Sequence, residues 1–445
     1  MTNYYITTPI YYCNDYPHIG HAYTTIACDI LARYHKLKNE EVYFLTGTDE
    51  HGQKVEKAAN LKKIDPKDFA DNISESFIKL VKFLNCDTND FIRTTENRHV
   101  KSAQSLWKIL DENNQIYKGN YEGWYSVIDE AFYDEKELIK KENNYFAPSG
   151  SKVEWVEEES YFFKLSNWSE KLLEHYNNNS NFIQPKTRYN EVYNFVKSGL
   201  RDLSISRSTF KWGIPIPNDK NHVMYVWLDA LQNYLSALEF PNINSDLYKK
   251  FWPGIHIVGK DILRFHAVYW PAFLMAANLE PPKEIFAHGW WTNNDQKISK
   301  STGNIIDPYK LINKFGLDEV RYFLFREVPF GEDGDFSEKA IINKNNNDLA
   351  NDYGNLVQRV CAFISKNCNK TVENNFILNK TDNEIINQSN DTLNEYIKFM
   401  DSYQIDKSLK KIFELISLSN SYIDYQAPWN LRKTDKNRMN VVLSI

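Results

Sequence analysis

The stretch PHIGHAYTT, residues 17–25, joins a strand-like segment to a helix-like segment and decides how the chain begins to fold. Residues 6–12 before it are rich in β-branched and aromatic side chains, which is typical of a strand. Apolar residues between 19 and 34 then recur at helical spacing. His18 and His21 therefore lie on the first turn of a predicted helix, where positions i and i+3 share one face.

This junction is a natural site for phosphate. The start of a helix offers backbone N–H groups and the positive end of the helix dipole, and Gly20 between the histidines lets a flat ring approach the backbone. The pattern H-x-G-H arises by chance in roughly 1 of 100 chains with these frequencies of histidine and glycine. The alternative interpretation is that one histidine caps the helix and the other packs against the core.

Length and composition narrow the class of protein. A chain of 445 residues predicts two to four domains. The net charge of −6 excludes a generally basic nucleic-acid coat, so any contact with nucleic acid is local. We expect no membrane span and no secretory signal, because long apolar runs are absent from the sequence. Five scattered cysteines without C-x-x-C spacing favour a reduced, cytoplasmic location over a disulfide framework.

The order of predicted elements indicates an α/β fold. Residues 4–10, 19–36 and 41–45 form a strand, a helix and a strand, a unit that implies a parallel sheet. A helix is predicted at 66–85. Between 117 and 226, short aromatic strands (124–133, 145–156 and 161–165) alternate with charged turns, which predicts an inserted domain.

Strands of the parallel sheet are then expected to return. The apolar runs predicted to form them are 223–227, 255–259 and 285–288. After about Ser337 the sequence is helical and rich in Asn and Lys. The apolar run 441–445 predicts a helix that is cut short, so we expect a truncated form of a longer chain.

A second motif, QKISKSTGN at residues 296–304, suits a mobile phosphate clamp. Lysines neutralise phosphate as point charges, and Gly303 gives the loop freedom to close. The alternative interpretation is an exposed basic turn.

The two motifs together resemble those of class I aminoacyl-tRNA synthetases, which carry H-I-G-H near the start and K-I-S-K-S after a split sheet. Five further stretches are similar to the bacterial methionyl-tRNA synthetase family: TTPIYY (7–12), TGTDEHG (46–52), YVWLDA (225–230), GKDI (259–262) and APW (427–429). They cover nearly the whole chain in the order of the family.

This resemblance implies a fold and a reaction. The fold would be a Rossmann-like parallel sheet split by an inserted domain and followed by an α-helical anticodon-binding domain. The expected parts are the first half of the catalytic domain at 1–115, the inserted connective domain at 116–222, the second half at 223–290, a lysine-loop region that contacts the tRNA stem at 291–340, and the helical domain at 341–445. The reaction would convert methionine and ATP into methionyl adenylate and then charge tRNA.

The resemblance also implies where ATP binds. His18 and His21 would hold the phosphates, Gly20 would lie under adenine, and Asp261 would hold the ribose hydroxyls. Lys297, Ser299 and Lys300 of the second motif would close on the departing pyrophosphate, with Mg²⁺ accompanying ATP.

The methionine pocket would be a mostly apolar slot with one carboxylate for the ammonium group, Asp49. The side chain of methionine would lie among Ile10, Tyr12, Trp227, Ala230, Leu231, Tyr234, Ile262 and His266. Leu231 stands where some relatives have proline. Trp227 and Ile262 would be buried by packing in any case, whereas a carboxylate after an apolar strand lies where ligands bind in parallel sheets.

The inserted domain departs from the zinc knuckle that many relatives carry there. Ser126 and Asp129 take the places of one cysteine pair, and Ala147 and Gly150 take the places of the other. A structural zinc site needs about four Cys or His ligands, so we expect no structural zinc.

The helical domain would read the anticodon of methionine tRNAs, initiator and elongator. Asn351, Asn355 and Arg359 fall at i, i+4 and i+8 of a predicted helix, and Trp429 follows Ala-Pro. Single-stranded bases are bound by aromatic stacking and by hydrogen bonds to their edges. A basic cluster beside Trp429 either contacts phosphates or forms a solvated helix face; its members are Arg432, Lys433, Lys436 and Arg438.

Three other interpretations compete with this one. A class I synthetase for leucine, isoleucine or valine would carry a larger editing insertion than 116–222, whereas one for cysteine is not excluded on that ground. A catalytically inactive tRNA-binding protein would not need both motifs intact. A small-molecule nucleotidyltransferase would not need the helical domain.

Overall fold

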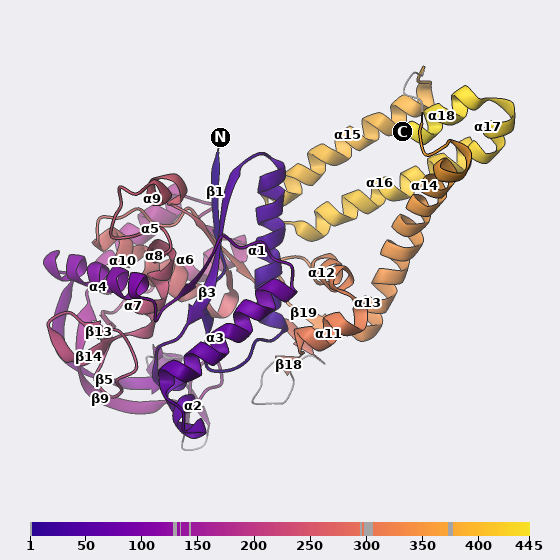
Figure 1. Ribbon diagram of the computed structural model, residues 1–445. Coiled ribbons are helices and arrows are strands. Elements are labelled where there is room, and N and C mark those ends of the chain that lie inside the picture. The colour runs from indigo at the N-terminus through magenta and orange to yellow at the C-terminus, as the bar shows by residue number, and fades with distance from the viewer. Residues whose placement is uncertain are drawn as a thin grey trace. The chain divides into compact units, whose positions relative to one another are not determined.

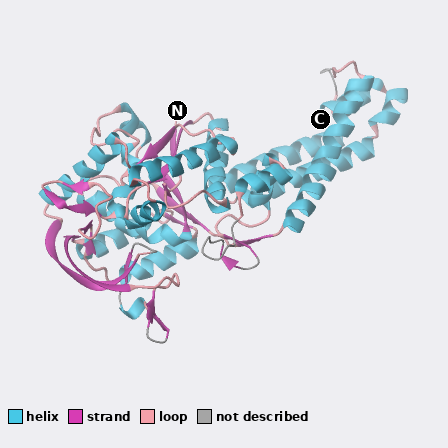
Figure 2. Cartoon of the chain, turned by 60° about the horizontal axis from the view of Figure 1, so that its bottom comes forward, coloured by secondary structure: helices cyan, strands magenta, loops and turns pink. Residues whose placement is uncertain are grey.

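The computed structural model describes residues 2–127, 131–133, 135–141, 144–293, 296–297, 306–372 and 377–445. The chain divides into two compact units, Met1–His288 and Gly289–Ile445. The first unit is built on a sheet and the second is mainly helical (Figures 1 and 2). None of the helices in the described part of the chain is long and apolar enough to cross a membrane.

A seven-stranded parallel sheet forms the centre of the first unit. Its strands are β1 (Asn3–Thr7), β2 (Tyr11–Tyr12), β3 (Glu41–Asp49), β4 (Asp90–Arg93), β10 (Ile183–Gln184), β15 (Ile255–Gly259) and β16 (Glu284–His288). They follow the order β10-β16-β15-β1-β3-β2, and β4 also pairs with β3. Every pairing is parallel.

The order of the strands reverses at β1. The chain first runs outward through α1 (Ile19–Leu37) to β3, and through α2 (Gln53–Lys62) and α3 (Pro66–Phe83) to β4. It later returns to β15 and β16 on the other side of β1. Ligands of such sheets bind at the carboxyl ends of the strands where the order reverses. The predicted strand, helix and strand at the start of the chain, and the helix near 66–85, are confirmed to within a few residues.

Two long antiparallel strands, β5 (Ile116–Ser126) and β9 (Glu154–Phe163), dominate the segment between the two halves (Figures 1 and 2). The other elements described there are β6 (Ala131–Tyr133), β7 (Ile139–Lys141), β8 (Asn144–Phe146), β11 (Leu203–Ser204), β12 (Ser206–Arg207), β13 (Pro215–Ile216), β14 (Asp219–Met224), the 3-10 helices η1 (Glu135–Glu137) and η2 (Leu165–Trp168), α5 (Ser169–Asn178) and α6 (Lys186–Lys197). The short strand β10 comes from the same segment but joins the edge of the parallel sheet.

The prediction of a parallel strand at 223–227 is wrong. Residues up to Met224 belong to β14, which pairs antiparallel with β12 and β13. Val226 begins the helix α7 (Val226–Leu231). Met224 at the end of β14 and Val226 at the start of α7 are both buried. A short apolar run does not distinguish a buried strand from the start of a buried helix. Trp227 is therefore on a helix.

The remainder of the first unit is helical apart from β15 and β16. It comprises α4 (Asn97–Glu112), α8 (Asn233–Ser236), α9 (Asp246–Phe251), the 3-10 helix η3 (Lys260–Ile262), the π-helix η4 (Phe265–Tyr269) and α10 (Trp270–Ala276). One large cluster of buried apolar side chains joins these helices to the sheet. Helix α1 packs on β1, β3 and β15, which places its first turn at the reversal point.

The second unit starts with a small sheet of β17 (Trp291–Asn293), β18 (Gln296–Lys297) and β19 (Gly334–Phe336). Its helices are α11 (Pro308–Phe315), α12 (Leu317–Arg326), α13 (Glu338–Lys344), the π-helix η6 (Asn345–Gly354), α14 (Asn355–Asn367), α15 (Lys380–Asp401), α16 (Ile405–Gln426), α17 (Pro428–Thr434) and α18 (Lys436–Ser444). Among the described residues after Ser337 there is no strand, as predicted.

A buried ion pair joins three of these helices. Asp382 on α15 is fully buried and accepts hydrogen bonds from Arg438 on α18 at 2.5 and 2.7 Å and from the Tyr422 hydroxyl on α16 at 2.7 Å. Burial raises the pKa of Asp382, but these partners outweigh it and lower the pKa to about 2. Arg438 thus stabilises the packing of these helices. It is neither part of a solvated helix face nor available for phosphate, the two interpretations given for the basic cluster.

Candidate active site

The two histidines cap the helix that they begin. His18 is the N-cap of α1, and its Nδ1 accepts a hydrogen bond from Gly20 N at 3.0 Å. His21 Nδ1 accepts one from His18 N at 3.0 Å, and the two rings stack with centroids 3.9 Å apart. This is a capping box in which imidazoles take the roles that Ser or Thr and Glu usually fill.

Capping fixes the chemistry of both rings. Because each Nδ1 accepts from a backbone N–H, the proton of a neutral ring is on Nε2. An Nε2–H group donates, which is the polarity that a phosphate oxygen requires. The alternative that one histidine caps and the other packs is therefore too simple, since both take part in the cap.

Gly20 is required by the His18 ring. A Cβ atom at position 20 would lie 2.9 Å from Cε1 and 3.1 Å from Nδ1 of His18. The close approach of the His18 ring therefore explains why position 20 lacks a side chain. The predicted contact of Gly20 with adenine stays a prediction.

Aromatic and polar contacts support the histidines from both halves of the sheet. The His21 ring packs edge-on against Tyr11 and Phe77, at 4.9 and 5.1 Å between centroids. On the other side, Thr24 Oγ1 lies 2.8 Å from His288 Nε2 at the end of β16. The first turn of α1 is thus held by elements on both sides of the reversal point.

Asp49 is the last residue of β3 and is buried. Its main-chain neighbour across the sheet is Tyr12 of β2, another predicted methionine contact. The structure therefore brings these two residues together at the carboxyl edge of the sheet.

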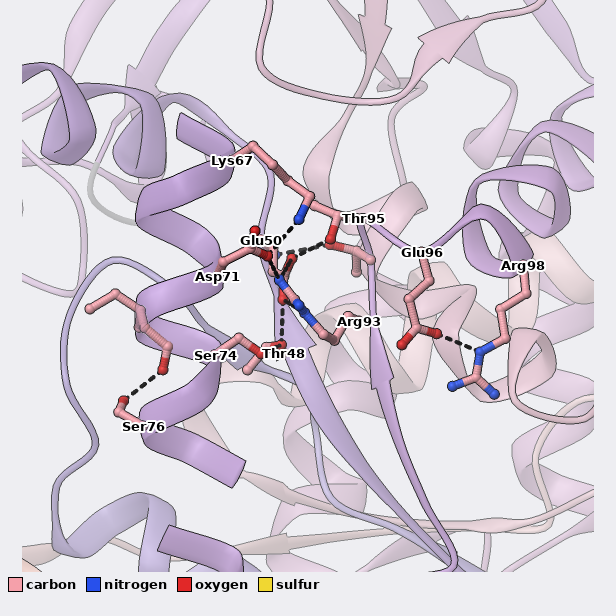
Figure 3. A network of polar contacts seen from close by, with 12 residues as sticks. Thr48, Glu50, Lys67, Asp71, Ser74, Ser76, Arg93, Thr95, Glu96 and Arg98 are labelled. Carbon is pink, nitrogen blue, oxygen red and sulfur yellow. Dashed lines mark hydrogen bonds and ion pairs between the residues drawn. The ribbon is translucent and has the colours of Figure 1, made fainter. Parts of the chain in front are cut away.

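A polar network missed by the sequence analysis holds the residue after Asp49 (Figure 3). Glu50 is fully buried. Its carboxylate accepts hydrogen bonds from Arg93 at 2.6 and 3.0 Å, from the Thr48 hydroxyl at 2.8 Å and from the Thr95 hydroxyl at 2.5 Å. Arg93 also binds Asp71 on α3. Glu50 was visible in the TGTDEHG stretch, but the arginine that neutralises it is the last residue of β4, and sequence spacing gives no sign of that pairing.

The predicted apolar wall is partly assembled around His266. Its Nε2 lies 2.7 Å from the Tyr234 hydroxyl, and its Nδ1 lies 2.9 Å from the carbonyl oxygen of Ile262. Burial lowers the pKa of His266 to about 4, so the ring is neutral at pH 7. Since a carbonyl only accepts, His266 Nδ1 carries the proton and Tyr234 donates to Nε2.

Trp227 completes this side of the wall. Its ring stacks on Phe265 with centroids 3.8 Å apart and meets His266 edge-on at 6.0 Å. Its buried Nε1 has no hydrogen-bond partner among the described residues. The other predicted contacts are either fully buried or packed at the margin of the core: Ile10, Ala230 and Leu231.

Asp261 lies on the opposite side of β1 from Asp49. It is exposed on the 3-10 helix η3, directly after β15, the strand that pairs with β1. A Cβ atom on Gly259 would lie 2.6 Å from its Oδ1. The location fits a ligand at the reversal point.

The lysine loop belongs to the second unit. The backbone of Lys297 pairs antiparallel with Thr292 in the small sheet. Ser299 and Lys300 lie outside the described residues. The roles predicted for these three residues stay predictions.

Hydroxyl groups occupy the region that the resemblance compares with a zinc knuckle. The buried Ser126 Oγ lies 2.8 Å from Ser151 Oγ, which lies 2.8 Å from Ser149 Oγ. Ala147 is fully buried beside them. Asp129 lies outside the described residues, and the prediction of no structural zinc stays a prediction.

The predicted anticodon residues are partly brought together. The Arg359 guanidinium lies over the Trp429 ring at 5.4 Å and binds Asp424. Trp429 is 41% exposed. Asn355 is exposed one turn before Arg359 on α14. Asn351 is exposed about one turn before Asn355, but it lies in the π-helix η6 and not on α14, so its place in the predicted stripe stays a prediction.

A family model described as tRNA synthetases class I (M) matches residues 4–361. The chain belongs to this family. A second model, described as the anticodon binding domain of methionyl tRNA ligase, matches residues 374–445. The predicted α/β fold with a helical anticodon-binding domain is thereby confirmed.

Relatives of this class I synthetase match it along almost its whole length. Proteins named methionine–tRNA ligase from Rickettsia bellii (strain RML369-C) and Brucella suis biovar 1 (strain 1330) are 56% and 51% identical over 444 residues, which is 99% of this chain and 86% of each relative. A solved structure of Mycobacterium tuberculosis methionyl-tRNA synthetase in complex with methionyl-adenylate is 45% identical, with a TM-score of 0.97 over 100% of this chain and 88% of that one.

Proposed function

We propose that the carboxyl edge of the parallel sheet activates methionine with ATP and that the helical unit reads the anticodon. As a member of the methionine–tRNA ligase family, the chain converts methionine and ATP into methionyl adenylate and pyrophosphate and transfers the methionyl group to tRNA. The observation that carries the assignment of the site is the imidazole capping box at the reversal point, in which each Nδ1 accepts from the backbone and the proton of a neutral ring is on Nε2.

The histidines act at the phosphate end. The methionine carboxylate attacks the α-phosphate in line, and charge builds on the phosphate oxygens, so stabilisation of charge and positioning dominate the rate. His18 and His21 donate from Nε2 to these oxygens, while Asp261 holds the ribose and Gly20 lies under adenine. Mg²⁺ enters with ATP as part of the substrate, and Lys297, Ser299 and Lys300 hold the departing pyrophosphate.

Asp49 acts at the methionine end by pairing with the ammonium group. The thioether lies in the wall formed by Trp227, Tyr234 and His266, whose neutral ring adds no charge to an apolar slot. Ile10, Tyr12, Ala230, Leu231 and Ile262 complete this wall. A general base is not needed, because the attacking carboxylate is already ionised at neutral pH.

The helical unit binds the anticodon of initiator and elongator methionine tRNAs. The exposed ring of Trp429 stacks on a base, and the guanidinium of Arg359 lies over the same ring. Asn355 offers an amide for the edge of a neighbouring base. We also propose a cytoplasmic location, because the five cysteines are all free thiols.

Exchange of pyrophosphate into ATP across a panel of amino acids tests the proposal. We expect exchange with methionine and little with leucine, isoleucine, valine or cysteine. Exchange with one of those four instead would indicate another class I synthetase. Absence of exchange with every amino acid would indicate an inactive tRNA-binding protein.

A further inference from the structure

A buried carboxylate with two histidine partners joins three separate elements of the first unit. Asp229 on α7 is 1% exposed, and each of its oxygens lies 2.7 Å from an imidazole nitrogen. The partners are Nδ1 of His51, which follows β3, and Nε2 of the fully buried His99 on α4. Neither the two motifs nor the predicted methionine pocket includes any of the three.

The carboxylate is ionised. Burial raises the pKa of Asp229, but the charges and hydrogen bonds of His51 and His99 outweigh it and lower the pKa to about 2. Since a carboxylate only accepts, each imidazole carries a proton on the nitrogen that faces it. A buried charge is tolerated only when its hydrogen-bond partners are in place. The geometry of the three side chains is therefore strongly constrained.

The cluster joins the two segments that carry Asp49 and Trp227, the proposed contacts of the methionine ammonium group and side chain. His51 is two residues after Asp49 on one segment. Trp227 is two residues before Asp229 on the helix α7. Residues i and i+2 point to different sides of a helix, so Asp229 holds one side of α7 while Trp227 stacks on Phe265 from another.

Further buried hydrogen bonds tie α4 to the segment that follows α7. His99 Nδ1 lies 3.0 Å from Ser236 Oγ, and Gln232 Nε2 donates to Ser102 Oγ at 2.8 Å. Helix α4 thus serves as a fixed support against which α7 is held. On the other segment, the ring of His51 packs edge-on against Trp212 at 5.3 Å.

We propose that Asp229, His51 and His99 form a positioning cluster that aligns Trp227 with Asp49 and so sets the affinity for methionine. This inference rests on the proposed placement of methionine between those two residues. Within the described part of the chain, the hydrogen bonds of the cluster reach α4, α7 and the segments after β3 and α7, and none of them reaches α1 or Asp261, the residue predicted to hold the ribose. Loss of the cluster therefore weakens binding of the amino acid and leaves binding of ATP nearly unchanged.

Substitution of His99 tests the inference, because this fully buried residue is not one of the proposed substrate contacts. His99→Leu removes the hydrogen bonds of this side chain to Asp229 and Ser236. His99→Gln keeps an amide N–H that can donate to Asp229. In pyrophosphate exchange we expect His99→Leu to raise the KM for methionine about 10- to 100-fold, the scale of losing a hydrogen bond to a charged group. The KM for ATP should stay close to that of the unaltered chain, and His99→Gln should recover most of the methionine affinity.

The matched control is another imidazole–carboxylate pair in the same unit. His35 Nδ1 lies 2.7 Å from Glu40 Oε2, at the end of α1 opposite to its capped first turn. Glu40→Gln should alter thermal stability without changing either KM. A purely structural role for His99 would give the same result as this control.

Three results would overturn the inference: equal increases of both KM values in His99→Leu, no recovery in His99→Gln, or an unchanged KM for methionine. If His99→Leu does not fold, Asp229→Asn is judged by the same selective rise in the KM for methionine. Absence of methionine-dependent exchange by the unaltered chain would refute the proposed function. Normal exchange by that chain with an unchanged KM in the variants would refute the cluster alone.

Discussion

His21 has two roles that substitution can separate, because they use different nitrogen atoms. Nδ1 accepts a hydrogen bond from His18 N within the capping box, whereas Nε2 is proposed to donate to phosphate. His21→Ala removes both. Loss of one cap costs about 1 kcal/mol, which lowers the melting temperature by about 2–4 °C in a unit of this size.

The catalytic loss should be much larger than the cap explains. Removal of one donor to developing oxyanion charge costs about 2.7–4 kcal/mol, so we expect adenylate formation by His21→Ala to fall by roughly 10²–10³-fold. The assay is pyrophosphate exchange at saturating methionine and ATP. The methionine dissociation constant, measured by equilibrium dialysis, should change little because Asp49 and the apolar wall are untouched.

His21→Glu is the control for the cap. Glutamate at the third helical position is a usual partner in a capping box but has no N–H to donate, so this variant should melt close to the unaltered chain and remain as inactive as His21→Ala. Recovery of exchange together with stability would show that the ring only caps. Collapse of methionine binding with an intact rate at saturation would place His21 at the wrong end of the site.

Three other predictions concern parts of the chain remote from this helix. Trp429→Ala should leave adenylate formation nearly unchanged and reduce tRNA charging by about 5- to 150-fold, the cost of losing one stacked base; normal melting with undiminished charging would remove Trp429 from the anticodon site. The purified protein should contain no stoichiometric zinc by elemental analysis, and a chelator should not change its melting, because no binding free energy of a metal would be lost. The pKa of Asp382 is about 2, below its ordinary value of 3.8, so its contribution to the stability of the helical unit should be complete above pH 3.8 and disappear as the pH falls through about 2. Asp382→Asn should therefore weaken the loss of stability at acid pH that circular dichroism melts measure. The same loss in the variant as in the unaltered chain would contradict the assignment.

Sequence alone predicted the parts of the fold that depend on local periodicity. The first strand, the helix after it and the next strand follow from alternating and helical apolar patterns, and observed boundaries such as Ile19–Leu37 agree closely. The pattern fails where two buried elements meet without a polar break. That is the case at Tyr225, where β14 gives way to α7 and both sides are apolar.

The sequence motifs predicted which residues belong to the candidate site, but not which side chains form hydrogen bonds and ion pairs with one another there. Both histidines and Asp49 are found at the carboxyl edge of the sheet, as the order of elements requires. The ion pair of Glu50 with Arg93 joins residues 43 positions apart, and that of Asp229 with His51 joins residues 178 apart. Such pairs form because the fold brings them together, and they leave no periodic signal in the sequence.

The spacing of the first motif follows from the geometry of a helix start. An N-cap and the third helical residue are the two positions whose side chains can satisfy each other's backbone N–H groups, and they are three apart. His18 and His21 occupy these positions, and the residue between them that faces the capping ring must lack a Cβ atom, as Gly20 does. Nδ1 of each ring accepts from the backbone in this cap, and Nε2–H is the donor that we propose for phosphate. A serine and a glutamate would cap this helix equally well, but they would offer phosphate no N–H donors, so the imidazoles are explained only when both roles are required of the same two residues.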